Sequence, residues 1–255
     1  GIKVIDKQQV VEKIKSWVQE VGKLQRDKFG TNLEVATKSS AIDLVTEVDE
    51  QSEQKLFDRI NANYPQHSIL AEESGRKERE ADYLWVVDPL DGTVNYAHGF
   101  PFFSISIALQ YQGSTQIGVV YAPVLDNLYW AIKGEGAVLN GKQLAVSHTD
   151  RLGDAMLATG FPYDRATAER NNVDNFNRLV TQVRGIRRAG SAALDLCQVA
   201  AGVFDGFWEL KLSPWDIEAG RLIIEEAGGR VKTSVEPEGI TLVSGNQAVY
   251  SLLLE

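Results

Sequence analysis

The stretch Trp85–Tyr96, which reads W-V-V-D-P-L-D-G-T-V-N-Y, constrains the fold of this chain more than any other. The apolar and β-branched run Tyr83–Val87 predicts a buried strand. Pro89 should end that strand, because proline has no N–H to donate to a sheet ladder. The Asp-Gly-Thr that follows is typical of a helix start, where unpaired N–H groups favour an anion. We therefore expect a strand, then a turn carrying the carboxylates of Asp88 and Asp91, then a helix.

Two explanations of this turn stay open from its residues alone. Asp91 can be a helix cap and Asp88 a turn former, with no ligand involved. Alternatively, the two carboxylates bind a cation while the helix start holds a phosphate group. Other parts of the chain have to decide between these explanations.

Composition limits the classes of protein to consider. The 255 residues are 44% hydrophobic and 24% charged, which predicts a folded chain with a substantial core. No apolar run approaches the ~20 residues of a membrane span. Cys197 is the only cysteine, which excludes an intrachain disulfide and argues against a thiolate zinc site. We expect a cytoplasmic protein without a membrane segment.

The net charge also restricts the expected partners. A formal charge of −9 argues against general binding to nucleic acid or to anionic membranes. It still allows an anionic substrate, provided that a bound cation inverts the local field.

Hydrophobic periodicity predicts alternating helices and strands without internal repeats. A loop or hairpin is expected over Gly30–Ile42 and a small hairpin around Asn140–Gly141. We expect helices over Lys7–Lys28, Val48–Ala62, Ala166–Val183, Ala192–Ala201, Pro214–Ala227 and Gln247–Leu253. We expect further strands over His67–Ala71, Phe103–Tyr111, Gln116–Tyr121, Asn127–Ile132, Gly185–Arg188, Gly206–Leu210 and Thr241–Ser244, and one from Met156.

A seam near Asp150 suggests two halves of one compact unit. Residues 1–150 form an α+β half with most of the candidate metal ligands. Residues 151–255 form an α/β half with the candidate substrate-recognition residues and the last metal ligand.

Further acidic residues occur at predicted strand ends and helix starts. Asp49 in T-E-V-D and Asp216 in S-P-W-D each follow a hydroxyl residue, Thr46 or Ser213, by three positions. The simplest explanation of each is a capping box, worth about 1 kcal/mol and needing no ligand. Likewise, Glu72 can simply be a solvated acid at a strand end.

Taken together, Glu72, Asp88, Asp91 and Asp216 indicate chemistry, because α/β folds collect their sites at such positions. Two carboxylates ~4 Å apart repel by about 4 kcal/mol at an effective dielectric constant of 20, and a helix start offsets only ~0.3–1 kcal/mol. A converging cluster therefore needs cations. Oxygen ligands select Mg²⁺ first, with Mn²⁺ or Ca²⁺ as substitutes in binding.

Three more motifs join the central stretch: W-D-I-E-A-G-R-L-I-I-E-E-A-G-G (Trp215–Gly229), L-A-E-E-S (Leu70–Ser74) and D-L-V-T-E-V-D (Asp43–Asp49). In this combination and order the chain resembles the inositol monophosphatase family of lithium-sensitive, Mg²⁺-dependent phosphatases. The resemblance covers essentially the whole chain. It implies an α/β fold, a layered α/β/α/β/α sandwich of the sugar-phosphatase type, and a homodimer.

The resemblance also implies a set of metal ligands, with two or three Mg²⁺ per subunit. Glu72, Asp88 and the backbone carbonyl of Leu90 would bind the first metal. Asp88, Asp91 and Asp216 would bind the second, and Glu72 with waters a weaker third. Lys38 matches a family position near that third metal, although a solvated loop lysine explains it equally well.

Catalytic and substrate-binding roles follow from the same resemblance. Asp49 and Thr93 would orient the attacking water on the first metal, so that Asp49, Glu72 and Thr93 are the implied catalytic residues. The backbone N–H groups of Gly92 and Thr93 would hold the phosphate. Glu209 would contact substrate hydroxyls, although it can equally be a solvated strand residue. The implied substrate contacts are Asp91, Gly92, Thr93, Gly190, Ala192, Glu209 and Asp216.

The predicted function is Mg²⁺-dependent hydrolysis of small phosphorylated polyols, with myo-inositol monophosphate as the first substrate to test. Related enzymes act on fructose 1,6-bisphosphate, on 3′-phosphoadenosine 5′-phosphate or on the 2′-phosphate of NADP, and the shared metal turn does not choose among these. A different class of function also stays open, because some bacterial relatives associate with the transcription machinery.

Overall fold

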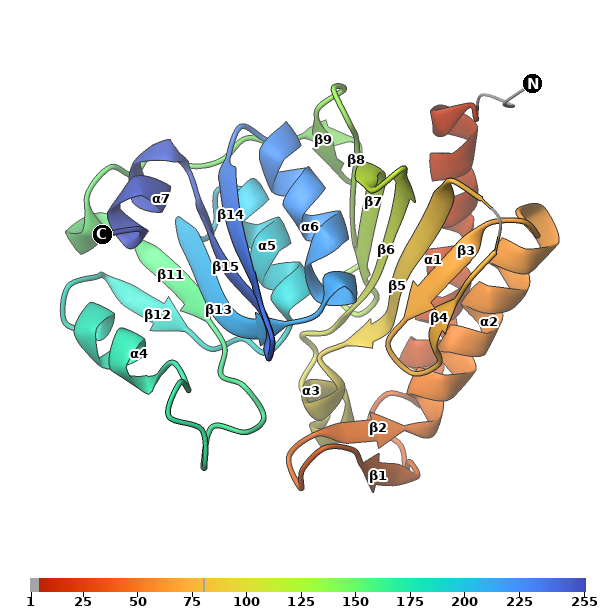
Figure 1. Cartoon of the computed structure of the whole chain (residues 1–255), viewed down its shortest axis with the longest axis horizontal. Helices are drawn as coiled ribbons and strands as arrows, with labels where there is room; N and C mark the ends of the chain where they lie inside the picture. Colours follow the sequence, from red (N-terminus) through yellow and green to blue (C-terminus); the bar gives the residue numbers. More distant parts are fainter. Residues whose placement is uncertain (1–4, 80) are drawn as a thin grey trace.

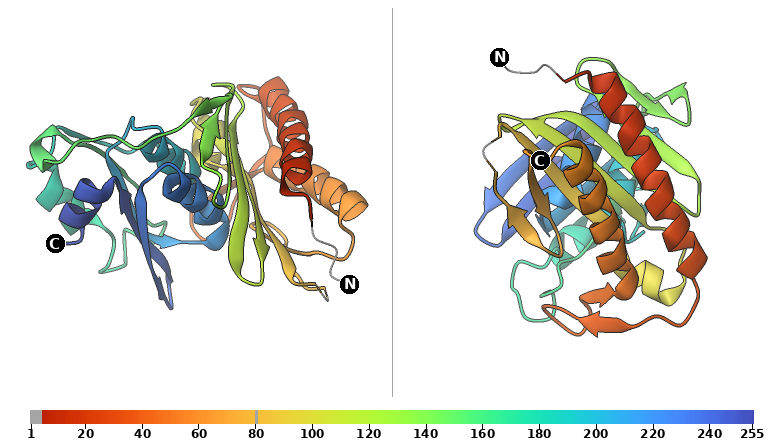
Figure 2. Two further views of the ribbon diagram at one scale, coloured as in Figure 1. Left: turned by 90° about the horizontal axis from the view of Figure 1, so that it is seen from above. Right: turned by 90° about the vertical axis from the view of Figure 1, so that its right-hand side faces the viewer.

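The computed structural model describes residues 5–79 and 81–255 and arranges them in five layers (Figures 1 and 2). Helices α1 (Lys7–Lys28) and α2 (Glu47–Asn63) cover the outer face of a first, eight-stranded sheet. Helices α5 (Ala192–Ala200) and α6 (Pro214–Glu226) lie between that sheet and a second, five-stranded sheet. Helices α4 (Val173–Val180) and α7 (Gln247–Leu253) form the last layer. This is the α/β/α/β/α sandwich that the resemblance implies.

The first sheet has the strand order β10-β9-β8-β7-β6-β5-β3-β4. Its pairs are antiparallel except for β3 with β5, which are parallel. Its strands are β3 (Ser68–Ala71), β4 (Gly75–Lys77), β5 (Tyr83–Asp91), β6 (Ser104–Tyr111), β7 (Ser114–Ala122), β8 (Asn127–Ile132), β9 (Ala137–Leu139) and β10 (Lys142–Gln143). A separate two-stranded hairpin pairs β1 (Val35–Thr37) with β2 (Leu44–Thr46), and α3 (Thr93–His98) follows β5.

The second sheet has the strand order β12-β11-β13-β15-β14, in which β11 pairs parallel with both β12 and β13. The other pairs are antiparallel. Its strands are β11 (Met156–Thr159), β12 (Gly185–Arg187), β13 (Gly206–Leu212), β14 (Arg230–Glu236) and β15 (Gly239–Gly245). The remaining elements are the 3-10 turn η1 (Leu152–Asp154), α4 (Val173–Val180) and α7 (Gln247–Leu253).

Two large apolar cores hold these layers together. One fills the space between the two sheets and includes Leu196, Phe207 and Ile223. The other lies between the first sheet and α1 and α2, and includes Trp17 and Trp85. Helices α5 and α6 both bury residues against the two sheets, and this packing fixes the position of one sheet relative to the other.

Most predicted elements are confirmed within a few residues, but two predictions are wrong. Pro89 does not end its strand: β5 continues to Asp91, and its register with β6 shifts between Asp88 and Asp91. A bulge of this kind tolerates proline because the extra residue makes no ladder hydrogen bond. The predicted helix Ala166–Val183 is only α4, Val173–Val180, and a loop precedes it. Strands β4 and β14 were not predicted.

Among the residues that the structure describes, no helix combines the length and apolar character that a membrane crossing requires.

Candidate metal centre

The bulge at the end of β5 presents two buried carboxylates. Asp88 is 1% exposed and Asp91 is 9% exposed. Asp88 Oδ1 accepts a hydrogen bond from the Leu90 N–H at 3.2 Å, so the turn folds back on its own carboxylate. The carbonyl of Pro89 in the same turn accepts from Nε2 of the buried Gln25, at 2.8 Å. The turn is therefore held both from within and from α1.

Asp216 at the start of α6 joins these two carboxylates. One oxygen each of Asp88, Asp91 and Asp216 lies within 4.8 Å of the others. Asp216 Oδ2 also accepts from the Ser213 N–H at 2.9 Å, which completes the capping box with Pro214 at the first helical turn. The predicted capping box and the predicted cluster are thus the same feature, because only one carboxylate oxygen is needed for the cap.

A second helix start contacts Asp91. Its Oδ2 accepts from the Ser191 hydroxyl at 2.6 Å and from the Ala193 N–H at 2.9 Å, both at the beginning of α5. Ser191 is the N-cap residue of that helix. Two helix N-termini therefore point their unpaired N–H groups and positive dipole ends towards the acidic cluster.

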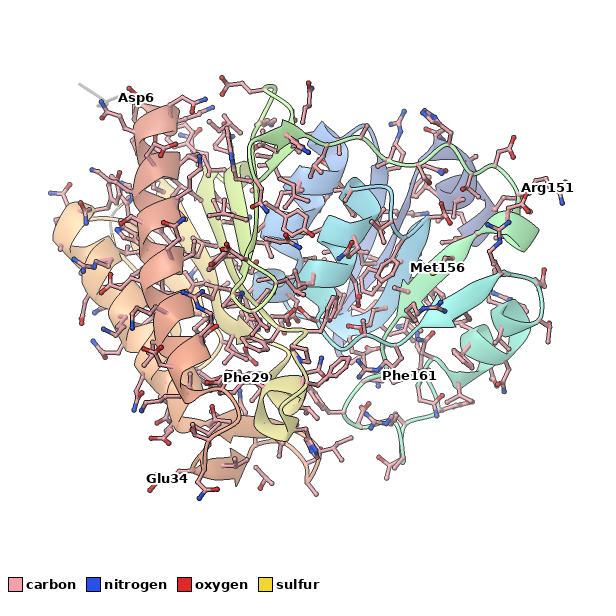
Figure 3. All side chains as sticks on the ribbon, turned by 180° about the vertical axis from the view of Figure 1, so that it is seen from behind. Asp6, Phe29, Glu34, Arg151, Met156 and Phe161 are labelled. Carbon is pink, nitrogen blue, oxygen red and sulfur yellow. The ribbon has the colours of Figure 1, made fainter. Side chains whose placement is uncertain are left out.

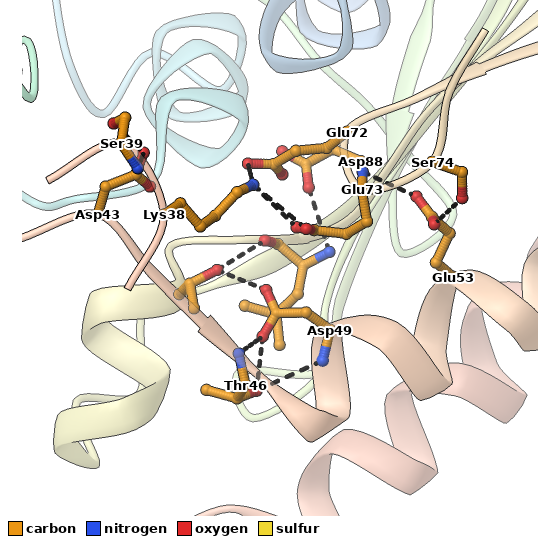
Figure 4. Close-up of polar contacts among 12 residues, drawn as sticks. Lys38, Ser39, Asp43, Thr46, Asp49, Glu53, Glu72, Glu73, Ser74 and Asp88 are labelled. Carbon is orange, nitrogen blue, oxygen red and sulfur yellow. Dashed lines mark hydrogen bonds and ion pairs between the residues drawn. The ribbon is translucent and has the colours of Figure 1, made fainter. Parts of the chain in front are cut away.

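Asp49 forms the other wall of the site (Figure 4). Its Oδ2 accepts from the Thr46 N–H at 2.9 Å in the predicted capping box of α2. Its Oδ1 accepts from the Thr93 hydroxyl at 2.7 Å, and that hydroxyl lies 3.3 Å from the carbonyl oxygen of Leu90. The pair Asp49–Thr93, 44 residues apart, thus joins the start of α2 to the start of α3 beside the bulge.

Glu72 lies beside Asp88 (Figure 4), but it does not belong to the close triad of Asp88, Asp91 and Asp216. Lys38 from the β1–β2 hairpin places its Nζ 3.6 Å from Glu72 Oε1 and 3.2 Å from Glu73 Oε2. Lys38 is therefore paired with both acids and is not a freely solvated loop lysine. Glu53 of α2 accepts from the Glu73 N–H at 3.0 Å and from the Ser74 hydroxyl, which fixes the β3–β4 turn.

Burial raises the pKa of every acid in the cluster, and repulsion by neighbouring carboxylates adds to this shift at Glu72, Asp88 and Asp216. Burial raises the pKa of Glu72 from 4.5 to about 7, against a lowering by Lys38. The pKa values of Asp88 and Asp216 lie well above their ordinary range, because burial and then the neighbouring carboxylates disfavour the charged form. For Asp91, burial outweighs the hydrogen bonds from Ser191 and the Ala193 N–H, so its pKa is also raised.

The residues fit a hard divalent cation. The ligands on offer are all oxygen atoms, and Asp88 Oδ2 is buried with no hydrogen-bond partner among residues 5–79 and 81–255. A buried carboxylate oxygen without a donor is costly, and a bound cation removes that cost. Oxygen-only ligand sets of this type are typical of Mg²⁺, Mn²⁺ and Ca²⁺.

Two glycines let the backbone close over the cluster. Gly92 has φ 98°, and a Cβ there would lie 3.1 Å from the carbonyl oxygen of Phe102 and 3.2 Å from that of Gly190. Gly190 itself has φ 96° and packs against the amide of Asn95. The predicted substrate-contact residues Gly92, Gly190 and Ala192 are thus brought to one edge of the acidic cluster.

Glu209 lies on β13 of the second sheet. Burial raises its pKa to about 8, and Arg188 opposes that shift. The sequence left open whether Glu209 is a solvated strand residue. In the structure Glu209 is half-buried and its carboxyl lies against Gly160, so it is not a fully solvated strand residue.

Four supporting residues were missed in the sequence: Gln25, Glu53, Asn95 and Ser191. Gln25 is a fully buried polar residue in the apolar stripe of α1, and Asn95 donates to the carbonyl oxygens of Phe102 and Ala189 at 2.7 and 2.8 Å. A polar residue inside an apolar stripe is a detectable signal of such a contact. The partners themselves are 64 residues away for Gln25 and 94 for Asn95, beyond what local patterns specify.

An enclosed carboxylate triad with hydroxyl partners at helix starts, on a five-layer α/β sandwich, defines a class of metal-assisted hydrolases. Comparison with known proteins gives the family. The sequence profile of the inositol monophosphatase family matches residues 6–251, and the chain belongs to this family of phosphatases.

The chain is similar to several characterised relatives. It is 45% identical to the Nus factor SuhB of Pseudomonas aeruginosa over 85% of this chain and 83% of the relative. It is 37% identical to the fructose-1,6-bisphosphatase/inositol-1-monophosphatase of Aquifex aeolicus over 92% of this chain and 89% of the relative.

Solved structures give the same result. The inositol monophosphatase of Anabaena superimposes with a TM-score of 0.86 at 38% identity, over 98% of this chain and 95% of the other. An IMPase/NADP phosphatase complexed with Mg²⁺ and phosphate superimposes with a TM-score of 0.82 at 29% identity, over 97% of this chain and 94% of the other. These comparisons confirm the predicted family and fold class.

Proposed function

We propose that this protein hydrolyses phosphomonoesters of small polyols in the presence of Mg²⁺, with myo-inositol monophosphate as the first substrate. The observation that carries the proposal is the convergence of Asp88, Asp91 and Asp216 within 4.8 Å at two helix starts. Three carboxylates within 4.8 Å of one another, two of them buried, are unfavourable without cations, and Mg²⁺ in proteins is commonly shared between carboxylates and substrate phosphate.

In this proposal Asp88, Asp91 and Asp216 hold one Mg²⁺, while Glu72, Asp88 and the Leu90 carbonyl hold another. When bound, such a pair of ions lowers the pKa of water, clamps the phosphoryl oxygens and stabilises the leaving alkoxide. A third, weaker ion would compete with Lys38 for Glu72, since Lys38 Nζ already lies 3.6 Å from that carboxylate.

Asp49 and Thr93 would orient the attacking water. The Thr93 hydroxyl donates its proton to Asp49 Oδ1 at 2.7 Å, so its free lone pairs can accept a hydrogen bond from water. Burial raises the pKa of Asp49, but the hydrogen bonds from Thr46 and Thr93 favour its ionised, accepting form. Asp49 thus acts on the water through Thr93 and fixes the direction of that acceptor.

The remaining predicted residues would bind the substrate. The backbone N–H groups of Gly92 and Thr93 face the phosphate, while Gly190, Ala192 and Glu209 face the polyol. A carboxyl that accepts hydrogen bonds from substrate hydroxyls rejects analogues without them, because it would be left buried and unpaired. Glu209 is accordingly the residue on which polyol preference depends.

Phosphate release from a substrate panel tests this function. The panel contains inositol 1-phosphate, fructose 1,6-bisphosphate, 3′-phosphoadenosine 5′-phosphate and NADP, each with Mg²⁺ and with EDTA. We expect EDTA-sensitive release, greatest from inositol 1-phosphate. A strong preference for NADP or for a bisphosphate would reassign the substrate, since relatives carry those names too. No release from any substrate would contradict the proposal.

Three further properties belong to the same proposal by family resemblance. Hydrolysis should be inhibited by millimolar Li⁺, the protein should sediment as a homodimer, and it should be found in the cytoplasm. Complete insensitivity to Li⁺ would indicate a metal site that differs from that of the family.

A second candidate function is association with the transcription machinery. The relative from Pseudomonas aeruginosa is named a Nus factor, and it is 45% identical to this chain. Binding to purified bacterial RNA polymerase, measured for the wild type and for Asp91→Asn, separates the two functions. Binding retained in a catalytically inactive variant would support an independent role, and absence of binding by both proteins would reject it.

A further inference from the structure

On strand β13 the side chains of Glu209 and its neighbour Trp208 point to opposite faces of the second sheet. Side chains alternate along a strand, and Phe207 packs into the core between the two sheets. Trp208 packs with Ala155 and Val249 in a smaller cluster against the outer layer. Glu209 therefore points towards the central helices and the metal centre, whereas Trp208 points away from it. A contact that fixes Trp208 on the outer face of the sheet can therefore also fix the position of Glu209 on the inner face.

Gly160 makes room for the Glu209 carboxyl. The parallel pairing of β11 with β13 runs to Thr159 opposite Trp208, which brings Gly160 next to Glu209. A Cβ at Gly160 would lie 1.4 Å from Glu209 Oε1 and 2.6 Å from its Cδ. The glycine is needed here for space, because any side chain at this position would displace the carboxyl.

Asn172 ties the same two strand ends together from the opposite face. It is 3% exposed and has a left-handed backbone with φ 74°, in the loop that leads from Phe161 to α4 (Figure 3). Its Nδ2 donates to Thr159 Oγ1 at 2.9 Å and to the Gly160 carbonyl at 2.7 Å. Its Oδ1 accepts from Trp208 Nε1 at 2.6 Å.

One more hydrogen bond closes this arrangement. The Thr159 hydroxyl donates to the Trp208 carbonyl at 2.7 Å, directly before Glu209 in the chain. Gly160, which lies against the Glu209 carboxyl, and Trp208, which precedes Glu209 in the chain, are therefore bound to the same buried amide. A fully satisfied buried network of this kind is rigid, and loss of one member leaves the others unpaired.

We propose that Asn172 and Gly160 are positioning residues that set the location of the Glu209 carboxyl and thereby the preference of the site for polyol hydroxyls. Neither residue belongs to the metal centre. The inference rests on the proposed function, which assigns polyol contact to Glu209.

The test compares two substrates. The preference ratio is kcat/KM for inositol 1-phosphate divided by kcat/KM for p-nitrophenyl phosphate, which lacks hydroxyl groups. Asn172→Gly tolerates the left-handed backbone while removing the amide, and Gly160→Ala displaces the carboxyl directly. We expect each variant to lower the preference ratio about tenfold, because a misplaced carboxyl loses the hydroxyl contact.

Asn246→Ala is the matched control. Asn246 is also a buried asparagine, caps α7 through Val249 N at 2.8 Å, and bonds Ser147 and Thr149 instead of β11 and β13. This variant should lose thermal stability and keep its preference ratio. A ratio that falls equally in Asn246→Ala would overturn the inference.

A double-mutant cycle adds a readout that a merely structural role would not give. In a Glu209→Ala background, Asn172→Gly should change the ratio less than twofold, because its target is already gone. A further tenfold fall there, or an unchanged ratio in both Asn172→Gly and Gly160→Ala, contradicts the inference. If Asn172→Gly does not fold, Gly160→Ala alone decides.

A crystal structure separates this inference from the proposed function. Wild-type protein that cleaves no polyol phosphate contradicts the proposed function only. In that case, displacement of the Glu209 carboxyl in the Asn172→Gly or Gly160→Ala structure still supports the positioning role, and an unmoved carboxyl in both structures rejects it.

Discussion

The metal centre and the surroundings of Glu209 are built in opposite ways. Asp49 and Asp216 are each fixed by a residue three positions earlier, and Asp88 by a residue two positions later. Glu209 instead depends on Asn172, whose partners lie 12, 13 and 36 residues away. Asp91 is the exception in the metal centre, because it accepts hydrogen bonds from Ser191 and Ala193, 100 and 102 residues away. Most groups proposed for chemistry thus have a local hydrogen bond, whereas the group proposed for selectivity depends on distant segments. Substitutions in the two regions should therefore have different consequences.

Asp91→Asn should have the largest effect. Changes to residues that only support metal ligands cost 10–100-fold, so removing a proposed ligand should lower turnover by more than about a hundredfold. The loss should be large for every substrate, because the metal centre acts on the phosphate group that all of them share. Phosphate release measures it, and circular dichroism checks the fold. The same change at the exposed Asp58 is the control, and undiminished turnover of Asp91→Asn would reject the site.

Glu209→Ala should have a smaller and selective effect. We expect kcat/KM for inositol 1-phosphate to fall about tenfold more than kcat/KM for p-nitrophenyl phosphate, since only the former has hydroxyls to bind. Steady-state kinetics with both substrates measure the difference. Equal losses for both substrates would remove the distinction between the two regions.

The pH dependence of stability should report on the carboxyls whose pKa is raised, which are those of the metal centre and Glu209. The pKa of Glu72 is about 7 in the folded protein against an ordinary 4.5, so the folded state binds more protons between these values. Stability of the metal-free protein should therefore fall as pH rises from 4.5 to 7, lowering Tm by roughly 5 °C. Thermal melts in EDTA measure this fall.

Two controls accompany the melts. Glu72→Gln has no titrating carboxyl at this position and should make the fall in Tm smaller. Added Mg²⁺ at pH 8 should restore Tm, because the cation binds the ionised carboxylates. A Tm in EDTA that stays constant or rises over this pH range would show that the carboxylates do not oppose folding.

Asn95→Ala should have the smallest effect and tests the connection between the regions. Asn95 joins α3 to the Ala189 carbonyl at 2.8 Å, across 94 residues of chain. Removing this donor should cost about 1–2 kcal/mol of unfolding free energy, measured by urea titration. Asn63→Ala, at an exposed asparagine that bonds within α2, should cost less than about 0.5 kcal/mol. Equal losses of unfolding free energy in Asn95→Ala and Asn63→Ala would mean that the hydrogen bond between Asn95 and Ala189 does not stabilise the protein.

The sequence predictions are accurate where local patterns determine the structure and wrong where distant contacts determine it. Helices α1 and α7 and strand β8 are confirmed with the predicted bounds, because each carries a clear apolar pattern between polar ends. The helix predicted over Ala166–Val183 is mostly loop, although the segment contains no glycine or proline. Asn172 in its left-handed conformation ends that loop because Trp208, Thr159 and Gly160 bind its side chain.

The sequence by itself determined the family, the layered fold and the positions of the acidic residues, because the motifs around Asp49, Asp88 and Asp216 are short and their caps are local. Only the tertiary structure decided that these carboxylates meet and that Gln25, Asn95 and Ser191 support them. It alone also placed the Glu209 carboxyl against Gly160, on a strand whose Trp208 is bound by Asn172. Such contacts form only when the two sheets and the central helices pack, since burial forces distant polar groups to become one another's partners.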